Sequence, residues 1–303
     1  MISVIIPLYN KEQQIAETLR SVLAQTFTDF EIVIVDDGST DRSVQEALKI
    51  RDPRIRLVRQ KNAGVSAARN RGVEEARFDL VAFLDADDRW KPEYLQTQYE
   101  LSQRYPQCDV FCCNYEFVHT DGTVHPTIIR KLPFEGQKGI LNNYFEVASC
   151  SHPPICSISI MVQKTALQHI GGFPIDIRSG EDLLTWATLA CNYNIAYDKT
   201  PVACFYVEGY DMLDKPKRLP DPENKVGREL INLSKKHSYP GLKHYISHWH
   251  KMRASVYMRL GMRKHCMAEA LQALRFSPAN VKVCMYIILV MLPQNLKTAI
   301  LSK

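Results

Sequence analysis

Several features that would place a protein in a familiar class are missing from this 303-residue sequence. It contains nine cysteines, but no pair has the C-x-x-C spacing of a zinc site. It has neither a G-x-G-x-x-G nor a G-x-x-x-x-G-K-[ST] motif, which argues against dinucleotide redox chemistry and against ATP hydrolysis. No basic run is interleaved with aromatic residues, so we do not expect a nucleic-acid partner.

Long apolar runs are also missing. The most apolar segment, residues 281–292, contains Lys282 and ends before Pro293, whereas a membrane-spanning helix needs about 20 residues. The N-terminus lacks the basic and apolar regions of a signal peptide. The odd number of scattered cysteines is typical of reduced thiols. We therefore expect a cytoplasmic protein, with peripheral contact at the inner membrane face as an alternative.

The composition is that of a globular protein with a mildly basic balance. Hydrophobic residues make up 46% and charged residues 23% of the chain, and the net charge is +5. In the first hundred residues, nearly all-apolar strands alternate with helical patterns, which predicts a doubly wound, mostly parallel α/β sheet. We expect strands at residues 3–7, 31–35, 55–58 and 80–84, and helices at 11–25, 44–50 and 62–76, the first of them capped by Asn10.

Three carboxylates follow the last of these strands, at Asp85, Asp87 and Asp88. Closely spaced carboxylates repel one another, and a divalent cation such as Mg²⁺ or Mn²⁺ would relieve the repulsion. A second interpretation is an acidic turn that caps the helix beginning near Pro92, because Asp is a favoured N-cap residue. The carboxyl end of a strand is also where open α/β sheets bind ligands.

Asp36 and Asp37 end another strand, directly before Gly38. An Asp in such a position can accept hydrogen bonds from a base or a ribose, as acidic residues do in other nucleotide-binding folds. The alternative is a plain Asx turn with no ligand.

The helix expected at residues 62–76 begins with small residues and carries Arg69 and Arg71. Small side chains allow its positive N-terminus to approach phosphates closely. Residues two apart do not share a helix face. We expect Arg69 to point into the site and Arg71 to face solvent.

Glu181 and Asp182 begin a helical pattern after a turn at residues 170–174. Acidic residues are favoured in the first turn of a helix by its dipole, which is a sufficient structural reason for them.

Four segments stand in the order and spacing of one known family. They read SVIIPLYN (3–10), VDDGSTDRS (35–43), NAGVSAARNRG (62–72) and FLDADD (83–88). Together they resemble the family 2 glycosyltransferases of GT-A fold. The resemblance implies inverting transfer of a sugar from a UDP-sugar to a hydroxyl acceptor with Mn²⁺ or Mg²⁺ as cofactor. Such enzymes commonly build bacterial surface glycans, often on lipid-linked acceptors.

The resemblance also implies roles on the donor side. Pro7 and Tyr9 would line the base and ribose pocket, and Asp37 would contact uracil. Arg69 would lie near the nucleotide.

The segment Asp85-Ala86-Asp87 matches the D-x-D element of the family, which favours the metal interpretation. Asp85 and Ala86 would then belong to the nucleotide-sugar site, with Asp85 facing the ribose, and Asp87 would hold the metal. In the family, an acidic element after the I-G-G-F turn supplies the catalytic base. We assign that role to Asp182 and an acceptor-binding role to Glu181, with an exchange of the two as the alternative.

The remainder of the chain completes this domain and adds a helical region. We expect the GT-A domain at residues 1–228, with a donor half at 1–105 and an acceptor half at 106–228, followed by helices at 229–303. Within the acceptor half we expect strands at 110–117 and 155–162, an irregular segment at 123–150, and a linker or flap at 208–228.

The C-terminal region predicts a helical hairpin at residues 244–260 and 264–276 and a last helix at 281–292. The last helix either packs on the hairpin or lies against anionic lipid, which Lys282, Lys297 and Lys303 would contact. We expect the histidines at residues 244, 248 and 250 on the helix surface.

Two other functions remain open from the sequence. One is a non-catalytic member that binds a nucleotide-sugar or a partner. The other is a sugar-phosphate nucleotidyltransferase, although residues 8–12 do not form the glycine-rich basic loop expected after its first strand.

Overall fold

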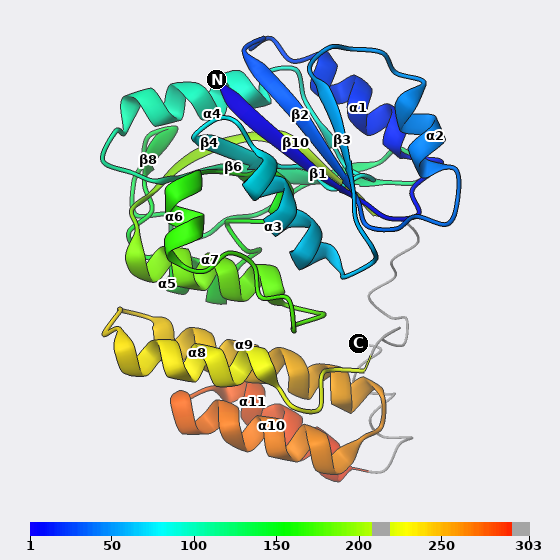
Figure 1. Ribbon diagram of the computed structural model, residues 1–303. Coiled ribbons are helices and arrows are strands. Elements are labelled where there is room, and N and C mark those ends of the chain that lie inside the picture. Colours follow the sequence, from blue (N-terminus) through cyan, green and yellow to red (C-terminus); the bar gives the residue numbers. More distant parts are fainter. Residues whose placement is uncertain (208–218, 293–303) are drawn as a thin grey trace. The chain divides into compact units, whose positions relative to one another are not determined.

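The computed structural model describes residues 1–207 and 219–292 (Figure 1). The chain forms two compact units, residues 1–209 and 210–303. Most of the predicted linker, and Lys297 and Lys303, lie outside the described residues. The first helix of the second unit begins at Lys225, so the helical region begins before residue 229, where the sequence placed it.

A mixed sheet of ten strands runs through the described part of the first unit, in the order β3-β2-β1-β4-β9-β6-β10-β5, with β7 beside β6 and β8 beside β10. Neighbours β3, β2, β1 and β4 are parallel, as are β6 and β10. Strand β9 runs antiparallel between β4 and β6 and joins the two parallel groups. The predicted mostly parallel mixed sheet is confirmed. The strands are β1 (Ile2–Leu8), β2 (Phe30–Asp36), β3 (Ile55–Arg59), β4 (Leu80–Phe83), β5 (Arg89–Trp90), β6 (Val110–His119), β7 (Val124–Pro126), β8 (Lys138–Ile140), β9 (Ile160–Gln163) and β10 (Ile195–Val207).

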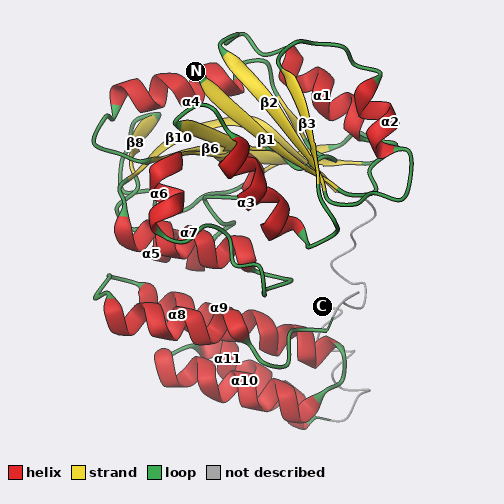
Figure 2. Ribbon diagram, in the orientation of Figure 1, coloured by secondary structure: helices red, strands yellow, loops and turns green. Residues whose placement is uncertain are grey.

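Helices cover both faces of this sheet (Figure 2). On β2, alternate residues point to opposite faces: Val33 and Val35 pack on Ala68 of α3, whereas Ile32 and Ile34 join the core cluster that contains α1. Both faces of the strand are therefore buried, which explains its continuous apolar sequence. The helices are α1 (Ile15–Leu23), α2 (Ser43–Leu48), α3 (Val65–Glu75), α4 (Tyr94–Arg104), α5 (Tyr144–Cys150), α6 (Lys164–His169) and α7 (Glu181–Asn192).

Three local expectations were wrong. Asn10 does not cap α1; it has a left-handed backbone (φ 51°), and its side-chain oxygen accepts a hydrogen bond from the Thr40 N–H at 2.9 Å. Residues 123–150 are not irregular throughout, since they contain β7, β8 and α5. The strand expected at 155–162 begins only at Ile160, because Ser157–Ser159 form a 3₁₀ turn.

Helix α3 holds the turn that leads to α7. The Asn70 amide donates to the Phe173 carbonyl, and its carbonyl oxygen accepts from the Phe173 N–H, both at 2.8 Å. Gly172 has a positive φ of 73°, and a Cβ there would lie 2.6 Å from the Asn70 side-chain oxygen. This close approach requires glycine, so two sequence segments a hundred residues apart are fixed to each other.

The second unit is helical in its described part, with α8 (Lys225–Lys236), α9 (Leu242–Arg259), α10 (Arg263–Phe276) and α11 (Val281–Met291). The predicted hairpin of α9 and α10 is confirmed, with Gly261 at the turn in a left-handed conformation. Across residues 1–207 and 219–292, the structure contains no helix of the length and apolarity that a membrane span requires.

The prediction that the three histidines lie on the surface of α9 was wrong for His250. His250 is buried, and its Nδ1 lies 2.6 Å from a carboxylate oxygen of Glu269 on α10. Arg253 donates to the other carboxylate oxygen at 2.7 Å. This contact could not be predicted, because no acidic residue lies beside the histidines in the sequence of α9.

Replacing Gly72 by Ala should destabilise the first unit. An added Cβ on α3 would overlap with Cγ2 of Ile5 on β1, and overpacking of this kind costs about 1–3 kcal/mol, against a helix-propensity gain of about 1 kcal/mol. Urea unfolding of the variant and of the wild type measures the resulting change in the free energy of unfolding. Gly136→Ala is the control, since its Cβ would meet nothing closer than 3.9 Å; equal stability of the two variants would contradict this account of the packing.

Candidate functional site

The carboxyl ends of β1, β2 and β4 bring the predicted donor residues to one edge of the sheet. Pro7 is buried near the end of β1, and Tyr9 follows it half exposed. The pairing of β1 with β4 ends at Ile5, so the missing N–H of Pro7 breaks no ladder bond on that side. The prediction that Pro7 and Tyr9 share this edge fits the structure; their contact with a nucleotide stays a prediction.

Asp36 and Asp37 have different partners. Asp36 accepts the Ser39 N–H at 3.0 Å and makes the Asx-type turn. Asp37 is buried and accepts the backbone N–H groups of Ala63 and Gly64 at 2.9 and 2.8 Å, which fixes the loop before α3. An Asx turn therefore accounts for the side-chain contact of Asp36, whereas it does not account for the contacts of Asp37.

Each carboxylate after β4 has its own partner. Asp85 accepts Nη2 of Arg69 at 2.8 Å and the hydroxyl of Ser157 at 3.0 Å. Asp87 accepts Nζ of Lys11 at 2.5 Å. The buried Asp88 accepts the backbone N–H of Tyr206 at 2.7 Å.

The interpretation of this turn as a helix cap is wrong. Helix α4 begins at Tyr94, and its N-cap residue Glu93 makes no side-chain capping bond. Burial, together with the charges of Asp85 and Asp87, raises the pKa of Asp88 well above its ordinary value. A turn used only as a cap would not bury one carboxyl beside two others.

Ala86 lies in the core and not at the open edge. The Thr18 hydroxyl donates to the carbonyls of Ala86 and Asp88, both at 2.9 Å, which holds the turn against α1. The side chain of Ala86 is thus unavailable to a ligand, and its predicted place in the donor site can concern only its backbone.

Arg69 joins two parts of the site. It is only 3% exposed, and besides Asp85 it pairs with Glu181, with Nη1 3.5 Å from the carboxylate. Burial alone would lower the pKa of Arg69, but the charges of Asp85, Asp182 and Glu181 raise it. Arg71 instead pairs with Glu75 at the surface, at 2.7 Å. Arg69 thus points inward and Arg71 lies at the surface, and the place of Arg69 in a nucleotide site stays a prediction.

Glu181 and Asp182 begin α7 after Gly180, whose φ is 82°. Glu181 is buried against Arg69, whereas Asp182 is partly exposed and its Oδ1 accepts the Leu183 N–H at 2.8 Å. Burial raises the pKa of both carboxyl groups; the charge of Asp182 adds to the effect at Glu181, and the charge of Arg69 opposes it at both. A partly exposed carboxyl with a raised pKa is suited to accept a proton.

Sequence reasoning missed two partners of these carboxylates, Lys11 and Ser157. Lys11 follows the SVIIPLYN segment, but nothing in its position signals an ion pair with a residue 76 positions away. Ser157 lies in a 3₁₀ turn where a strand was expected.

The side chains at this edge of the sheet supply only part of what a divalent metal site needs. Within residues 1–207 and 219–292, no three His, Cys, Asp or Glu side chains form a group that could hold a metal. Both oxygens of Asp85 already have partners. Asp87 is about a third exposed and offers carboxylate oxygens, so a metal here would need further ligands such as phosphate oxygens and water, as Mg²⁺ sites often have.

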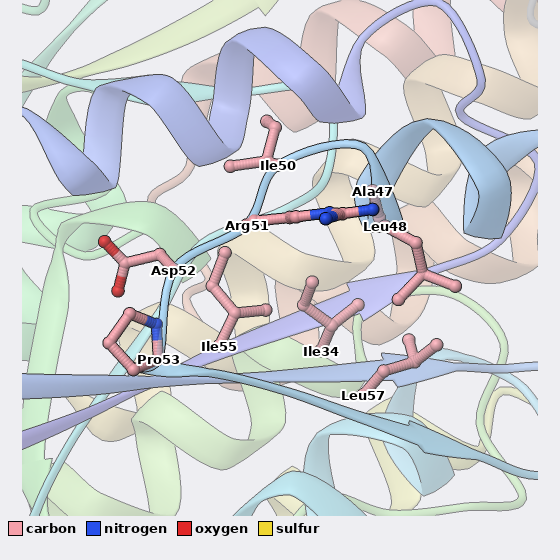
Figure 3. A pocket seen from close by; sticks show the side chains of 9 residues that line it. All are labelled: Ile34, Ala47, Leu48, Ile50, Arg51, Asp52, Pro53, Ile55 and Leu57. Carbon is pink, nitrogen blue, oxygen red and sulfur yellow. The ribbon is translucent and has the colours of Figure 1, made fainter.

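A hollow of about 410 Å³ lies elsewhere in the first unit, between α2 and β3 (Figure 3). Figure 3 shows Ile34, Ile55 and Leu57 projecting from the sheet toward it. Its lining includes none of the predicted site residues and has charged groups only at Arg51 and Asp52. It offers little that would recognise a polar ligand.

The sequence pattern of Glycosyl transferase family 2 matches residues 3–160, more than half of the chain. The chain belongs to glycosyl transferase family 2. An "Uncharacterized glycosyltransferase" of Rickettsia felis is 34% identical over 205 residues, which are 64% of this chain and 31% of that protein. The match thus spans about a third of the length of that relative. The putative teichuronic acid biosynthesis glycosyltransferase TuaG of Bacillus subtilis is 33% identical over 192 residues, 62% of this chain and 71% of TuaG.

The fold of this family 2 member is also that of a solved structure. S. aureus TarS 1-349 in complex with UDP-GlcNAc superposes with a TM-score of 0.68 at 19% identity, covering 95% of this chain and 90% of the TarS chain. At this identity the likeness concerns the fold alone. The GT-A fold predicted from the sequence is confirmed.

Replacing Arg69 by Met should destabilise the first unit much more than replacing Arg71 by Met. Arg69→Met leaves buried carboxylates without their cation, which costs about 3–5 kcal/mol. Arg71 takes part only in exposed pairs, which contribute about 0–1 kcal/mol. Chemical denaturation of both variants measures this contrast, and similar losses would show that Arg69 does not hold the site together.

Proposed function

We propose that this family 2 member transfers a sugar from a UDP-sugar to a hydroxyl of a glycan or lipid-linked acceptor, with inversion, in the synthesis of a bacterial cell-surface polysaccharide or glycolipid. The observation that carries the proposal is the position of Arg69. It pairs with Asp85 on the predicted donor side and with Glu181 beside the predicted base. Donor and acceptor groups would then meet around one buried charge.

The donor would lie at the carboxyl edge of β1, β2 and β4. Tyr9 is exposed enough to cover a base or ribose, and Pro7 shapes the backbone beneath it. Asp37 and Asp85 would accept hydrogen bonds from the uracil and the ribose. Nη1 of Arg69 faces Glu181 and Nη2 faces Asp85, whereas its Nε makes no hydrogen bond to the described residues. The charge of this guanidinium could serve the anionic part of the donor.

The acceptor hydroxyl would be deprotonated by Asp182. Its oxygen would attack the anomeric carbon as the bond from that carbon to the diphosphate breaks on the opposite face, so the proton passes to Asp182 and UDP leaves. Glu181, held by Arg69, would orient the acceptor. Asp182 suits the base better than Glu181 because it is more exposed and does not pair directly with Arg69.

The cofactor in this proposal would be Mn²⁺ or Mg²⁺, with Asp87 as its protein ligand. When bound, such an ion neutralises charge on the departing diphosphate. Asp87 offers the hard oxygen that these ions prefer. Lys11 pairs with that carboxylate and would have to leave it for a metal to bind there.

The relatives support this substrate class without fixing it. TarS has been solved with UDP and with UDP-GlcNAc, and TuaG is named for teichuronic acid biosynthesis. UDP-GlcNAc is therefore the first donor to test, within a panel of UDP-sugars.

The pH dependence of transfer tests the proposed base. Only ionised Asp182 can accept the proton, so kcat should rise with pH through its pKa, which burial raises above the ordinary value of about 3.9. Asp182→Asn should lower kcat by about 10²–10⁴-fold and still bind UDP. The measurement is a pH–rate profile of transfer, with the UDP-sugar from which UDP is released as donor and with its acceptor present.

Glu181→Gln is the matched control and should keep the acid limb of the profile. If Glu181→Gln loses the limb and Asp182→Asn keeps it, the two roles are exchanged. If no UDP-sugar of the panel binds with or without Mn²⁺, the chain is not a UDP-sugar transferase.

Replacing Lys11 by Met should tighten Mn²⁺ binding in the absence of nucleotide. The ion must displace Lys11 from Asp87, and the partly exposed pair contributes up to about 1 kcal/mol, which corresponds to a gain of about two- to fivefold. Electron paramagnetic resonance of free Mn²⁺ measures the affinity. Lys49→Met, which removes an exposed lysine paired with Glu46 on α2, should leave it unchanged; weaker binding by Lys11→Met would argue against Asp87 as ligand.

A further inference from the structure

Helix α11 of the second unit is apolar on two faces. Val283, Leu289 and Val290 are buried in a core cluster with residues of α9 and α10. Val281, Met285, Ile288 and Met291 are between 51% and 71% exposed. Because these four recur every three or four residues, they share one side of the helix.

Packing alone does not explain this exposed side. A helix that only covers a core needs one apolar stripe, and the other positions are ordinarily polar. On α11 the one charged residue is Lys282, and the exposed side forms a continuous apolar strip. Contiguous exposed apolar surface of this kind marks an interaction site.

The charge of the chain is divided very unevenly. Residues 219–292 contain twelve Lys and Arg but only four Asp and Glu, a net charge of +8. Residues 1–207 contain twenty-one Lys and Arg and twenty-six Asp and Glu, a net charge of −5. Asymmetry of this size points to an anionic partner for the basic part.

Cationic side chains flank α11 at both ends. Lys282 is exposed in its first turn, close enough to Lys251 of α9 for its charge to add to burial in lowering the pKa of Lys251. At the other end, Nη2 of the exposed Arg263 lies 3.5 Å from the carbonyl oxygen of Leu292. An apolar strip between cations matches the acyl boundary and anionic headgroups of a lipid surface.

We propose that α11 lies in the surface of an anionic membrane, with the strip formed by Val281, Met285, Ile288 and Met291 among the acyl chains. Eleven residues extend about 16 Å, too short for a hydrocarbon core of about 30 Å, so the helix lies in the interface. A second copy of the chain is a poorer occupant, because it would bring together two copies of residues 219–292, each with a net charge of +8. The inference does not rest on sugar transfer.

Vesicle co-sedimentation of the full chain, without donor or metal, tests the proposal. We expect binding to vesicles of phosphatidylcholine with about a third phosphatidylglycerol, and weaker binding to phosphatidylcholine alone or in high salt. The double variant Met285→Asp/Ile288→Asp should lose at least tenfold in vesicle affinity. Leu48→Asp is the matched control, since Leu48 on α2 is 54% exposed but lies in the first unit; it should bind as the wild type does.

A fluorophore on Cys284 gives a second readout. Cys284 is exposed on α11. The emission maximum of an environment-sensitive fluorophore attached there should move to shorter wavelength when anionic vesicles are added. The variant Cys284→Ser corrects for labelling at other thiols. Circular dichroism checks that the variants keep their helices.

Three results would overturn the proposal. The first is no binding of the wild type to any of these vesicles. The second is equal vesicle binding by the double variant and by Leu48→Asp. The binding would then come from the overall charge of the protein and not from the apolar strip. The third is a dimer, seen by sedimentation velocity, that the double variant dissociates while neither protein binds vesicles; this would assign the strip to a second copy.

Discussion

Arg69 places one buried positive charge between carboxylates that come from distant parts of the sequence. Asp85 follows β4, and Glu181 begins α7. Carboxylates this close would repel one another at a buried site, so their position depends on the shared cation. The same helix provides the other constraints: Gly72 lets α3 approach β1, and Asn70 fixes the turn before α7. The short run of residues 69–72 therefore determines how the turn after β4 and the start of α7 lie relative to each other.

The parts of this arrangement that the sequence predicts are those encoded locally. Strands such as β1 and β2 are buried on both faces and read as continuous apolar runs. The acidic turns follow them directly, and the parallel order brings those turns to one edge. Helix geometry predicted that Arg69 and Arg71 would not share a face, and apolar residues at helical spacing predicted the start of α7. The family resemblance added only the role expected of the carboxylates there.

The parts that could not be predicted depend on tertiary contacts. The pair of Lys11 with Asp87, the hydroxyl of Ser157 at Asp85 and the contact of His250 with Glu269 each join residues on different elements. Asn10 was misread because an asparagine before a helical pattern is a good cap, whereas here it links two loops. Helix α5 was missed because its segment is mixed in composition and carries no clear helical pattern in the sequence.

The insertion of β9 has a consequence for how the chain becomes folded. Leu80 on β4 pairs with Gln163 on β9, so one edge of β4 has no partner until residue 163 has left the ribosome. An unpaired edge in an apolar sheet is a template for association with other chains. Residues 1–105 carry the donor motifs, yet they cannot complete their own sheet. Residues 1–105 therefore do not form a complete folding unit, because the edge of β4 stays unpaired until β9 has been synthesised.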